Sequence, residues 1–117
     1  MAKKSSPKAL LGAPTVELIS PTGLTNVAKG STVTAVFKVT TAGGPFTVKA
    51  DRIEVTTMGS TTVSICNPCA PIAPGSAYYH ITTTLPNGSR QYTIRLTATE
   101  TSSGDSSSAD ANYWTGP

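Results

Sequence analysis

Charged side chains are scarce in this sequence, where Asp, Glu, Lys and Arg make up only 13% of 117 residues. Long helices that face water need many polar and charged residues, so this deficit argues against them. Ser and Thr fill the missing polar positions, and Thr in particular favours the surface of a β-sheet. A chain of this length is expected to form one domain around one core.

The sequence also lacks an excess of charge outside its first eight residues. Its net charge is +3, and Lys3, Lys4 and Lys8 are three of its nine basic residues, which leaves six basic residues against six acidic ones. A neutral body argues against broad electrostatic binding to nucleic acid. No apolar run is long enough to span a bilayer, so we expect no membrane partner.

The N-terminus lacks the apolar core of a secretory signal peptide, because its longest apolar run is Ala9-Leu10-Leu11. We therefore expect a protein that is used without secretion, or one whose signal has been removed. Residues 1–13 are predicted to form an arm ahead of a domain at 14–117. Either Leu10 and Leu11 cover the open end of their own domain, or the arm docks on another subunit. The residues predicted to dock are Lys3, Lys4, Lys8, Leu10 and Leu11.

The strongest structural signal is the stretch from Pro86 to Thr99. Asn87-Gly88 supplies residues that tolerate a chain reversal. Apolar and polar residues then alternate with a period of two, which predicts a central strand of an antiparallel sandwich. The apolar positions are Tyr92, Ile94, Leu96 and Ala98.

Other segments predict further short strands separated by turns. The segment 14–21 has proline at both ends, which suits a strand at a sheet edge; 21–30 is predicted to be a loop. The apolar alternation changes phase near Asp51-Arg52, which predicts a bulge or a break there. Strands are also expected at 31–41, 61–66 with Val63 and Ile65 inward, 77–85 and 109–113. The whole pattern predicts an all-β sandwich of about seven or eight strands with Greek-key connections.

The chain resembles the immunoglobulin-like modules of bacteria and phages over roughly residues 14–115. The segments that carry the resemblance are 14–21 with 29–34, and 91–100 with the turn at Ser103-Gly104. Tyr92 stands where the family keeps its tyrosine corner, whose hydroxyl bonds to upstream backbone. The inter-sheet cysteine pair and the tryptophan of antibody domains are missing. The resemblance implies a module that binds a partner or acts as a spacer between other domains, and that does not catalyse a reaction.

The only cysteine motif is Cys66-Asn-Pro-Cys69. A structural zinc site uses four ligands, usually from two such pairs, and the second pair is missing. A redox dithiol normally precedes a helix, which is not expected here. A short disulfide that clamps the proline-rich loop is favoured, and two reduced thiols remain the alternative. We expect no metal and no cofactor.

No set of residues predicts catalysis, because the single imidazole, His80, lacks the flanking motifs of a nucleophilic triad. Three aromatic residues, Tyr78, Tyr113 and Trp114, are candidates for a surface that binds carbohydrate or protein. The alternative is that terminal aromatic residues close the end of the sandwich.

These observations together predict a non-enzymatic structural protein of a virus particle, such as a phage head decoration protein. Its expected partners are capsid or other virion subunits, with self-association as a further option. The alternative is a secreted or cell-surface bacterial module that binds carbohydrate or protein.

Overall fold

The computed structural model describes residues 13–41, 45–69 and 75–117. These residues form strands and connecting turns, with no helix among them, as the scarcity of charge predicts. No helix long and apolar enough to cross a membrane occurs in this described part of the chain. The eight strands are β1 (Thr15–Ser20), β2 (Leu24–Val27), β3 (Ser31–Thr40), β4 (Phe46–Thr56), β5 (Gly59–Cys66), β6 (Ser76–Leu85), β7 (Gln91–Glu100) and β8 (Ser106–Thr115).

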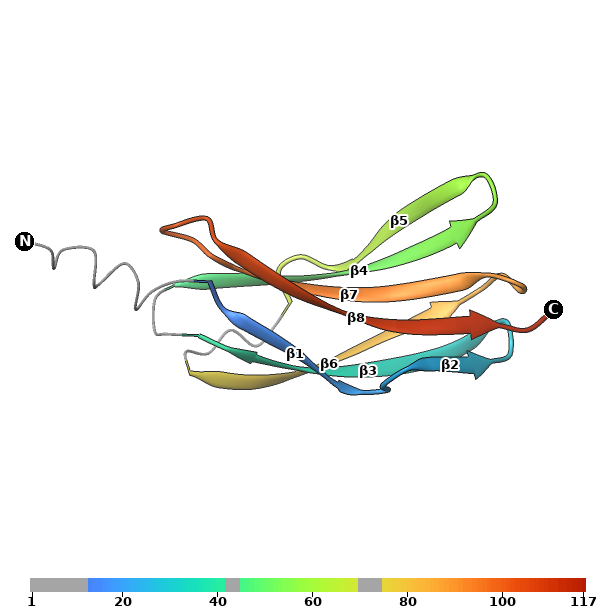
Figure 1. The fold of residues 1–117 in the computed structure, drawn as a ribbon, viewed down its shortest axis with the longest axis horizontal. Coiled ribbons are helices and arrows are strands. Elements are labelled where there is room, and N and C mark those ends of the chain that lie inside the picture. Colours follow the sequence, from blue (N-terminus) through green and yellow to red (C-terminus); the bar gives the residue numbers. More distant parts are fainter. Residues whose placement is uncertain (1–12, 42–44, 70–74) are drawn as a thin grey trace, which may run out of the picture.

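The strands form two sheets that lie face to face (Figure 1). The smaller sheet has the order β1-β3-β6, and the larger has the order β2-β8-β7-β4-β5. All pairs are antiparallel except β2 with β8. The all-β, two-sheet architecture predicted from the alternating pattern is therefore confirmed.

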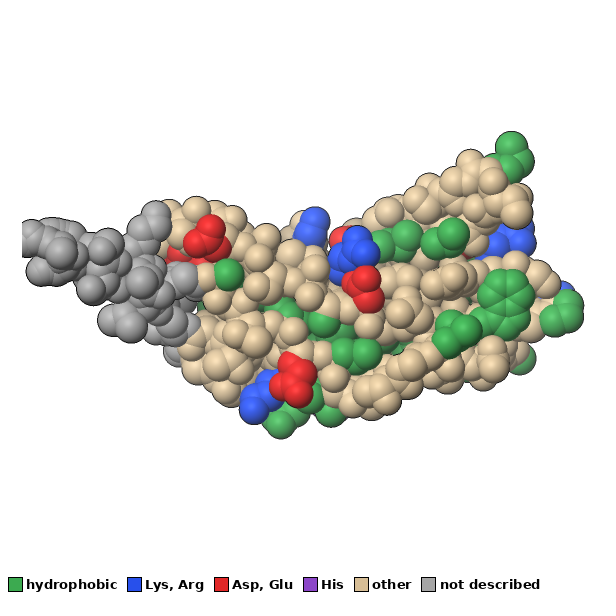
Figure 2. Space-filling view, in the orientation of Figure 1, with side chains coloured by type: hydrophobic (Ala, Val, Ile, Leu, Met, Phe, Trp, Pro, Cys, Tyr) green, Lys and Arg blue, Asp and Glu red, His purple; other side chains and the backbone are tan. Residues whose placement is uncertain are grey.

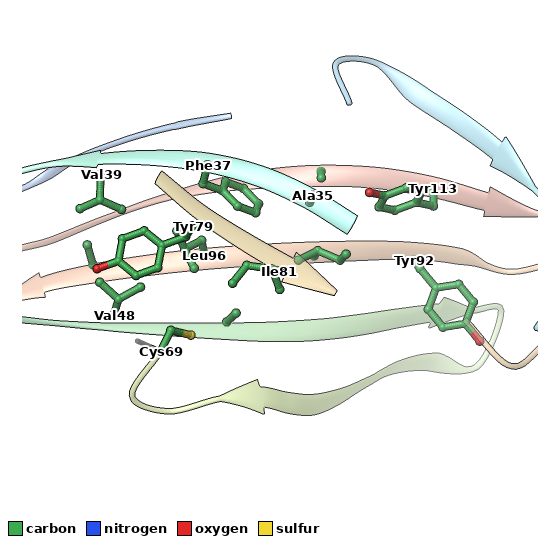
Figure 3. Packing of buried hydrophobic residues seen from close by; sticks show 14 of the residues in the cluster. Ala35, Phe37, Val39, Val48, Cys69, Tyr79, Ile81, Tyr92, Leu96 and Tyr113 are labelled. Carbon is green, nitrogen blue, oxygen red and sulfur yellow. The ribbon is translucent and has the colours of Figure 1, made fainter. Parts of the chain in front are cut away.

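The core lies between the sheets, and the alternation of the sequence places its residues there. In β7 every second residue from Tyr92 to Ala98 is buried, as predicted. On the corresponding face of β3, Ala35, Phe37 and Val39 are buried and Val33 is partly buried. Burial of such side chains contributes about 1.5–3 kcal/mol each to folding. Figure 3 shows the packing of Phe37, Val39, Val48, Tyr79, Ile81 and Leu96 from both sheets.

Two predictions about the first strands have different outcomes. β1 lies at an edge and pairs only with β3, which confirms the inference from its flanking prolines. The prediction of a loop over 21–30 was wrong in part, because β2 forms within it and runs parallel to the end of β8. β2 has only four residues, and its partner β8 lies far away in the sequence, so no local pattern predicts this strand.

The phase change in β4 has an unexpected consequence. The register shifts between Ala50 and Asp51, but only in the pairing with β5. The pairing with β7 continues unbroken from Phe46 to Val55. Arg52 and Glu54 therefore keep the inward face of Val48 and Ala50, and the apolar Ile53 and Val55 face outward.

β5 contributes less to the core than its sequence suggests. Ile65 packs partly against the core. Val63 lies on the inward face, as predicted, but it is 42% exposed. The reason is that the β4–β5 hairpin diverges from the smaller sheet (Figure 1), so the described strands of that sheet do not cover this side chain.

Candidate binding surface

One row of outward-facing side chains crosses one end of the larger sheet. In register, Trp114 of β8 lies beside Gln91 of β7, and Gln91 lies beside Val55 of β4. Trp114 is 39% exposed, and Val55 is 41% exposed. Leu24, on the neighbouring strand β2, is 61% exposed and extends the apolar surface. Figure 2 shows hydrophobic side chains gathered at this end of the molecule.

This row forms part of an open hollow of about 540 Å³, which we call the Trp114 hollow. The tip of the β4–β5 hairpin forms one wall, where Met58 is 94% exposed. The start of β7 forms its floor. The hollow is lined by Val55, Thr56, Thr57, Met58, Ser89, Arg90, Gln91 and Trp114.

A polar network beneath the hollow holds its floor in place. The Arg90 guanidinium donates to the Glu54 carboxylate at 3.2 Å and to the carbonyl oxygens of Gly88 and Ser89 at 3.3 Å each. The Tyr92 hydroxyl donates to Glu54 Oε1 at 2.9 Å. These bonds fix the Arg90 side chain, so the hollow exists before a ligand arrives.

The electrostatics of the network centre on Glu54, whose carboxyl group is mostly buried. Loss of water around this group raises its pKa. Hydrogen bonds from Tyr92, Asn87 and Arg90, together with the charge of Arg90, outweigh that effect, so the pKa lies below its usual value. Glu54 is therefore a carboxylate near neutral pH, and it balances the charge of Arg90.

Thr115 fixes the last strand beside the turn between β6 and β7. Its buried hydroxyl donates to the Asn87 carbonyl at 2.7 Å and accepts from the Arg90 N–H at 3.1 Å. This contact holds the end of β8 in place, and Trp114 is the residue directly before it.

The predicted surface of Tyr78, Tyr113 and Trp114 does not exist as one surface. Tyr113 is only 2% exposed and packs in the core, so its assignment to a binding surface was wrong. It alternates inward with Ala111, and Figure 3 shows it among the core residues. Tyr78 is 54% exposed but lies on β6 of the other sheet, where the Lys38 ammonium lies 5.8 Å from the centroid of its ring. Trp114 alone belongs to the hollow.

The Tyr92 hydroxyl contacts the backbone upstream of it, at the position that a tyrosine corner implies. It accepts a hydrogen bond of 3.0 Å from the N–H of Asn87. The same hydroxyl donates to Glu54, so it joins the turn after β6 to strand β4. Figure 3 shows Tyr92 at one end of the core.

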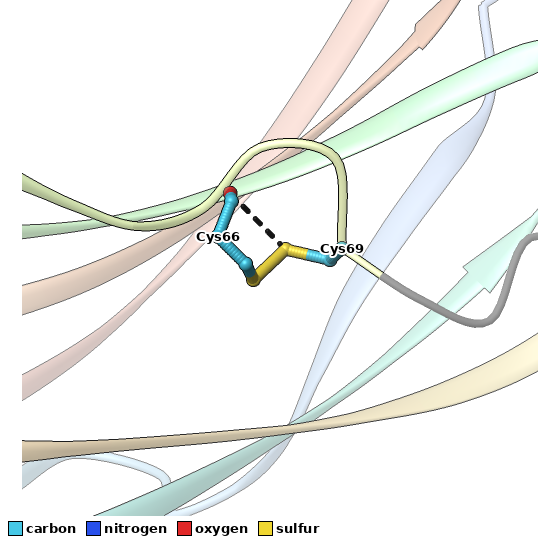
Figure 4. The surroundings of a disulfide bond; sticks show 2 residues. All are labelled: Cys66 and Cys69. Carbon is cyan, nitrogen blue, oxygen red and sulfur yellow. Dashed lines mark hydrogen bonds between the residues drawn. A yellow bond between two sulfur atoms is a disulfide. The ribbon is translucent and has the colours of Figure 1, made fainter.

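Cys66 and Cys69 form a disulfide in the structure (Figure 4). The N–H of Cys69 donates to the Val48 carbonyl at 2.7 Å, which ties this loop to the edge of β4. Among the described residues, no three His, Cys, Asp or Glu side chains gather into a metal site. His80 lies exposed on β6. The predicted docking residues Lys3, Lys4, Lys8, Leu10 and Leu11 lie outside the described residues.

Sequence reasoning did not find most residues of the hollow. Val55, Met58 and Arg90 carry no motif, and β4 and β7 become neighbours only in the fold. One signal was available for the aromatic residues, because Tyr113 follows the alternation of Ala109 and Ala111 and Trp114 does not.

Fold and surface together define an all-β, two-sheet protein with a preformed hollow at one end of its larger sheet. No protein family model and no curated protein sequence matches the chain. Among solved structures, the chain is similar to the sporulation control protein Spo0M from Bacillus subtilis, with 14% identity and a TM-score of 0.50. The match covers 90% of this chain and 49% of that chain, so this chain spans about half its length. At this identity the likeness concerns the fold alone.

Proposed function

We propose that this chain is a non-enzymatic binding module that recognises a protein partner through the Trp114 hollow. The observation that carries the proposal is the set of exposed apolar side chains of Trp114, Val55 and Met58, which line the hollow beside Arg90. Trp, Met and Arg are enriched at the centres of protein interfaces. The hollow suits an apolar side chain of the partner. Polar groups of the partner around that side chain would bond to Gln91 and Arg90.

The preformed state of the hollow supports this role. Arg90 is tied to Glu54 and to its own turn, and β8 is fixed beside that turn by Thr115. A rigid surface loses little conformational entropy when a partner binds, so more of the contact energy appears as affinity.

We further propose that the module belongs to the immunoglobulin-like family and to a virus particle, as a phage head decoration protein or similar accessory. The repeated passage of the chain between the two sheets supports this proposal, because Greek-key connections join the two sheets of immunoglobulin-like sandwiches. β1 begins at the end of the sandwich opposite the Trp114 hollow (Figure 1). In this proposal the basic arm docks on the shell, and the hollow at the far end meets another subunit.

Co-sedimentation with assembled capsid shells tests the docking arm. We expect the full chain to sediment with the shells at fixed stoichiometry, and the full chain carrying Lys3→Gln, Lys4→Gln and Lys8→Gln to bind much less. Failure of the unmodified chain to bind any shell contradicts the virion setting. Equal binding by the triple variant contradicts the role of the arm.

The hollow is tested separately through Trp114, the only tryptophan of the chain. Incorporated 5-hydroxytryptophan is excited at longer wavelength than the tryptophans of a partner. Its emission should shift to shorter wavelength when a virion subunit covers the hollow. Trp114→Ala should weaken that binding, and Tyr78→Ala, an exposed aromatic residue on the other sheet, should not. Binding that neither shifts the emission nor needs Trp114 rules out the hollow.

A second candidate function is a secreted or cell-surface module that binds carbohydrate, and the Cys66–Cys69 disulfide favours it. Disulfides persist mainly in oxidising compartments outside the cytosol. Trp114 offers a flat face for a sugar ring beside the amide of Gln91. Retention of the protein on a polysaccharide column, lost in Trp114→Ala, would favour this function over the virion setting.

A further inference from the structure

Strand β5 forms one border of the larger sheet and has a free edge. It pairs with β4 on one side, and no other described strand pairs with it. The residues from Gly59 to Ser64 are all exposed. A free edge presents unpaired N–H and C=O groups, which can bond to another strand.

The other sheet borders carry features that oppose strand addition. β1 is flanked by Pro14 and Pro21, and its register with β3 shifts. β2 has only four residues. At β6, the Arg52 guanidinium crosses between the sheets and donates to the Thr84 carbonyl at 2.8 Å, which occupies an acceptor there. Natural proteins protect their edges in such ways.

β5 has less of this protection. Its register with β4 shifts at Ile65, but the segment from Gly59 to Ser64 pairs without interruption. The segment from Gly59 to Cys66 contains no proline and no charged residue. Two copies of it brought together meet no charge repulsion. Thr-rich strands already pair elsewhere in this chain. Between β3 and β6, the hydroxyls of Thr32 and Thr84 bond at 3.0 Å, and those of Thr34 and Thr82 bond at 2.8 Å.

The order of residues in β5 is complementary to itself. Pairing with β4 places Ser60, Thr62 and Ser64 on the outward face, and Thr61 and Val63 on the inward face. An antiparallel pairing of two copies centred on Thr62 sets Thr62 against Thr62, Ser60 against Ser64 and Thr61 against Val63. Each position then meets a small or β-branched side chain on the same face.

We propose that two copies of this chain associate through β5 in this antiparallel register, with the two-fold axis at Thr62. The two five-stranded sheets then form one continuous sheet. Val63, which the smaller sheet leaves uncovered, gains a neighbour. Because the two-fold axis is perpendicular to the sheet, both Trp114 hollows lie on the same face, so the dimer presents two equal binding surfaces.

Sedimentation of the full chain over a range of concentrations tests this dimer. The mass should rise with concentration from 12.0 kDa to twice that value. Thr62→Lys sets two like charges opposite each other at the axis, and Thr62→Asp does the same with the opposite sign. Each variant should stay monomeric where the unmodified chain is dimeric. An equimolar mixture of the two should return to the dimer mass, because each Lys then faces an Asp.

Thr47→Lys is the matched control, since Thr47 is an exposed outward-facing residue of β4 away from the β5 edge. It should leave the dimer intact. Hydrogen exchange gives a second measurement that needs no variant: β5 amides should exchange slowly at high concentration and faster on dilution. A chain that stays monomeric, variants that dimerise as the unmodified chain does, or β5 exchange independent of concentration would each overturn the proposal.

Discussion

Two tyrosines that lie opposite each other in β7 and β8 differ in what their hydroxyl groups do. Tyr92 and Tyr113 are paired in register, and both are buried. The Tyr92 hydroxyl accepts from Asn87 and donates to Glu54. The Tyr113 hydroxyl has no partner among the described residues, and burial raises its pKa. The Tyr92 hydroxyl therefore stabilises the fold through two hydrogen bonds, whereas the Tyr113 hydroxyl is a buried polar group without a hydrogen bond to the described residues.

Tyr92→Phe should lower the free energy of unfolding by about 1–2 kcal/mol, because a charged acceptor and a backbone donor each lose a partner. Tyr113→Phe is the matched control and should be neutral or stabilising by up to about 1 kcal/mol, because it removes an unsatisfied hydroxyl. Urea denaturation of both variants measures the difference. Equal effects of the two substitutions would contradict the assigned role of Tyr92.

The lowered pKa of Glu54 makes stability depend on pH in a defined direction. The folded protein holds this carboxyl group ionised more strongly than the unfolded chain, where its pKa is near 4.5. The contribution to stability is therefore fully present above that pKa and is lost as pH falls through the lower folded value. Denaturation measured from neutral pH down to pH values below 4.5 should show this decline. Glu54→Gln should make the decline shallower, and an unchanged slope would exclude Glu54 as a source of it.

Among the elements, the turn between β6 and β7 does most to position the hollow. It contacts β4 through Glu54 and the end of β8 through Thr115. A Cβ atom placed on Gly88 would lie 2.6 Å from the Gly116 carbonyl oxygen, so this position requires glycine for close packing.

Gly88→Ala should lower the free energy of unfolding by about 1–3 kcal/mol, because backbone atoms must move to relieve the overlap. A Cβ atom on Gly116 meets nothing within 4 Å, so Gly116→Ala is the control and should have little effect. Thermal unfolding of both variants measures the contrast. If Gly88→Ala matched Gly116→Ala, the turn would not be packed as described.

The Cys66–Cys69 loop is an element with a modest expected contribution. The disulfide closes a loop with a sequence separation of only 3, which restricts the unfolded chain little. Reduction should lower stability by about 2 kcal/mol or less and leave the fold intact. Urea denaturation with and without a reductant measures this effect. A variant carrying Cys66→Ala and Cys69→Ala should not respond to the reductant, and global unfolding on reduction would show a larger role.

On the scale of the whole molecule, the interior between the two sheets determines stability. Leu96 is fully buried there, and Val55 lies on the outer face with 41% exposure. Leu96→Ala should cost about 2–5 kcal/mol through lost burial and the cavity left behind. Val55→Ala should cost less than about 1 kcal/mol and should weaken binding at the hollow instead. A reversed order of the two stabilities would contradict the placement of the core.

The alternation of β3 and β7 was predictable because it is a local property of the chain. A strand with one buried face requires apolar residues at every second position, and Val33 to Val39 and Tyr92 to Ala98 meet this requirement. The edge position of β1 followed from its prolines for an equally local reason. The hollow was not predictable, because Val55, Arg90 and Trp114 come from separate strands and have no fixed spacing.

Local sequence was enough to establish the all-β class, the central strands, the edge strand β1 and the turn at Asn87-Gly88. Each depends on residue preferences and periodicity over a few positions. The formation of β2, the inward orientation of Glu54 and the gathering of Val55, Arg90 and Trp114 at one hollow depended on the tertiary structure. These outcomes depend on which distant strands become neighbours and on what covers each face, and pairing between strands is set by packing of the whole molecule.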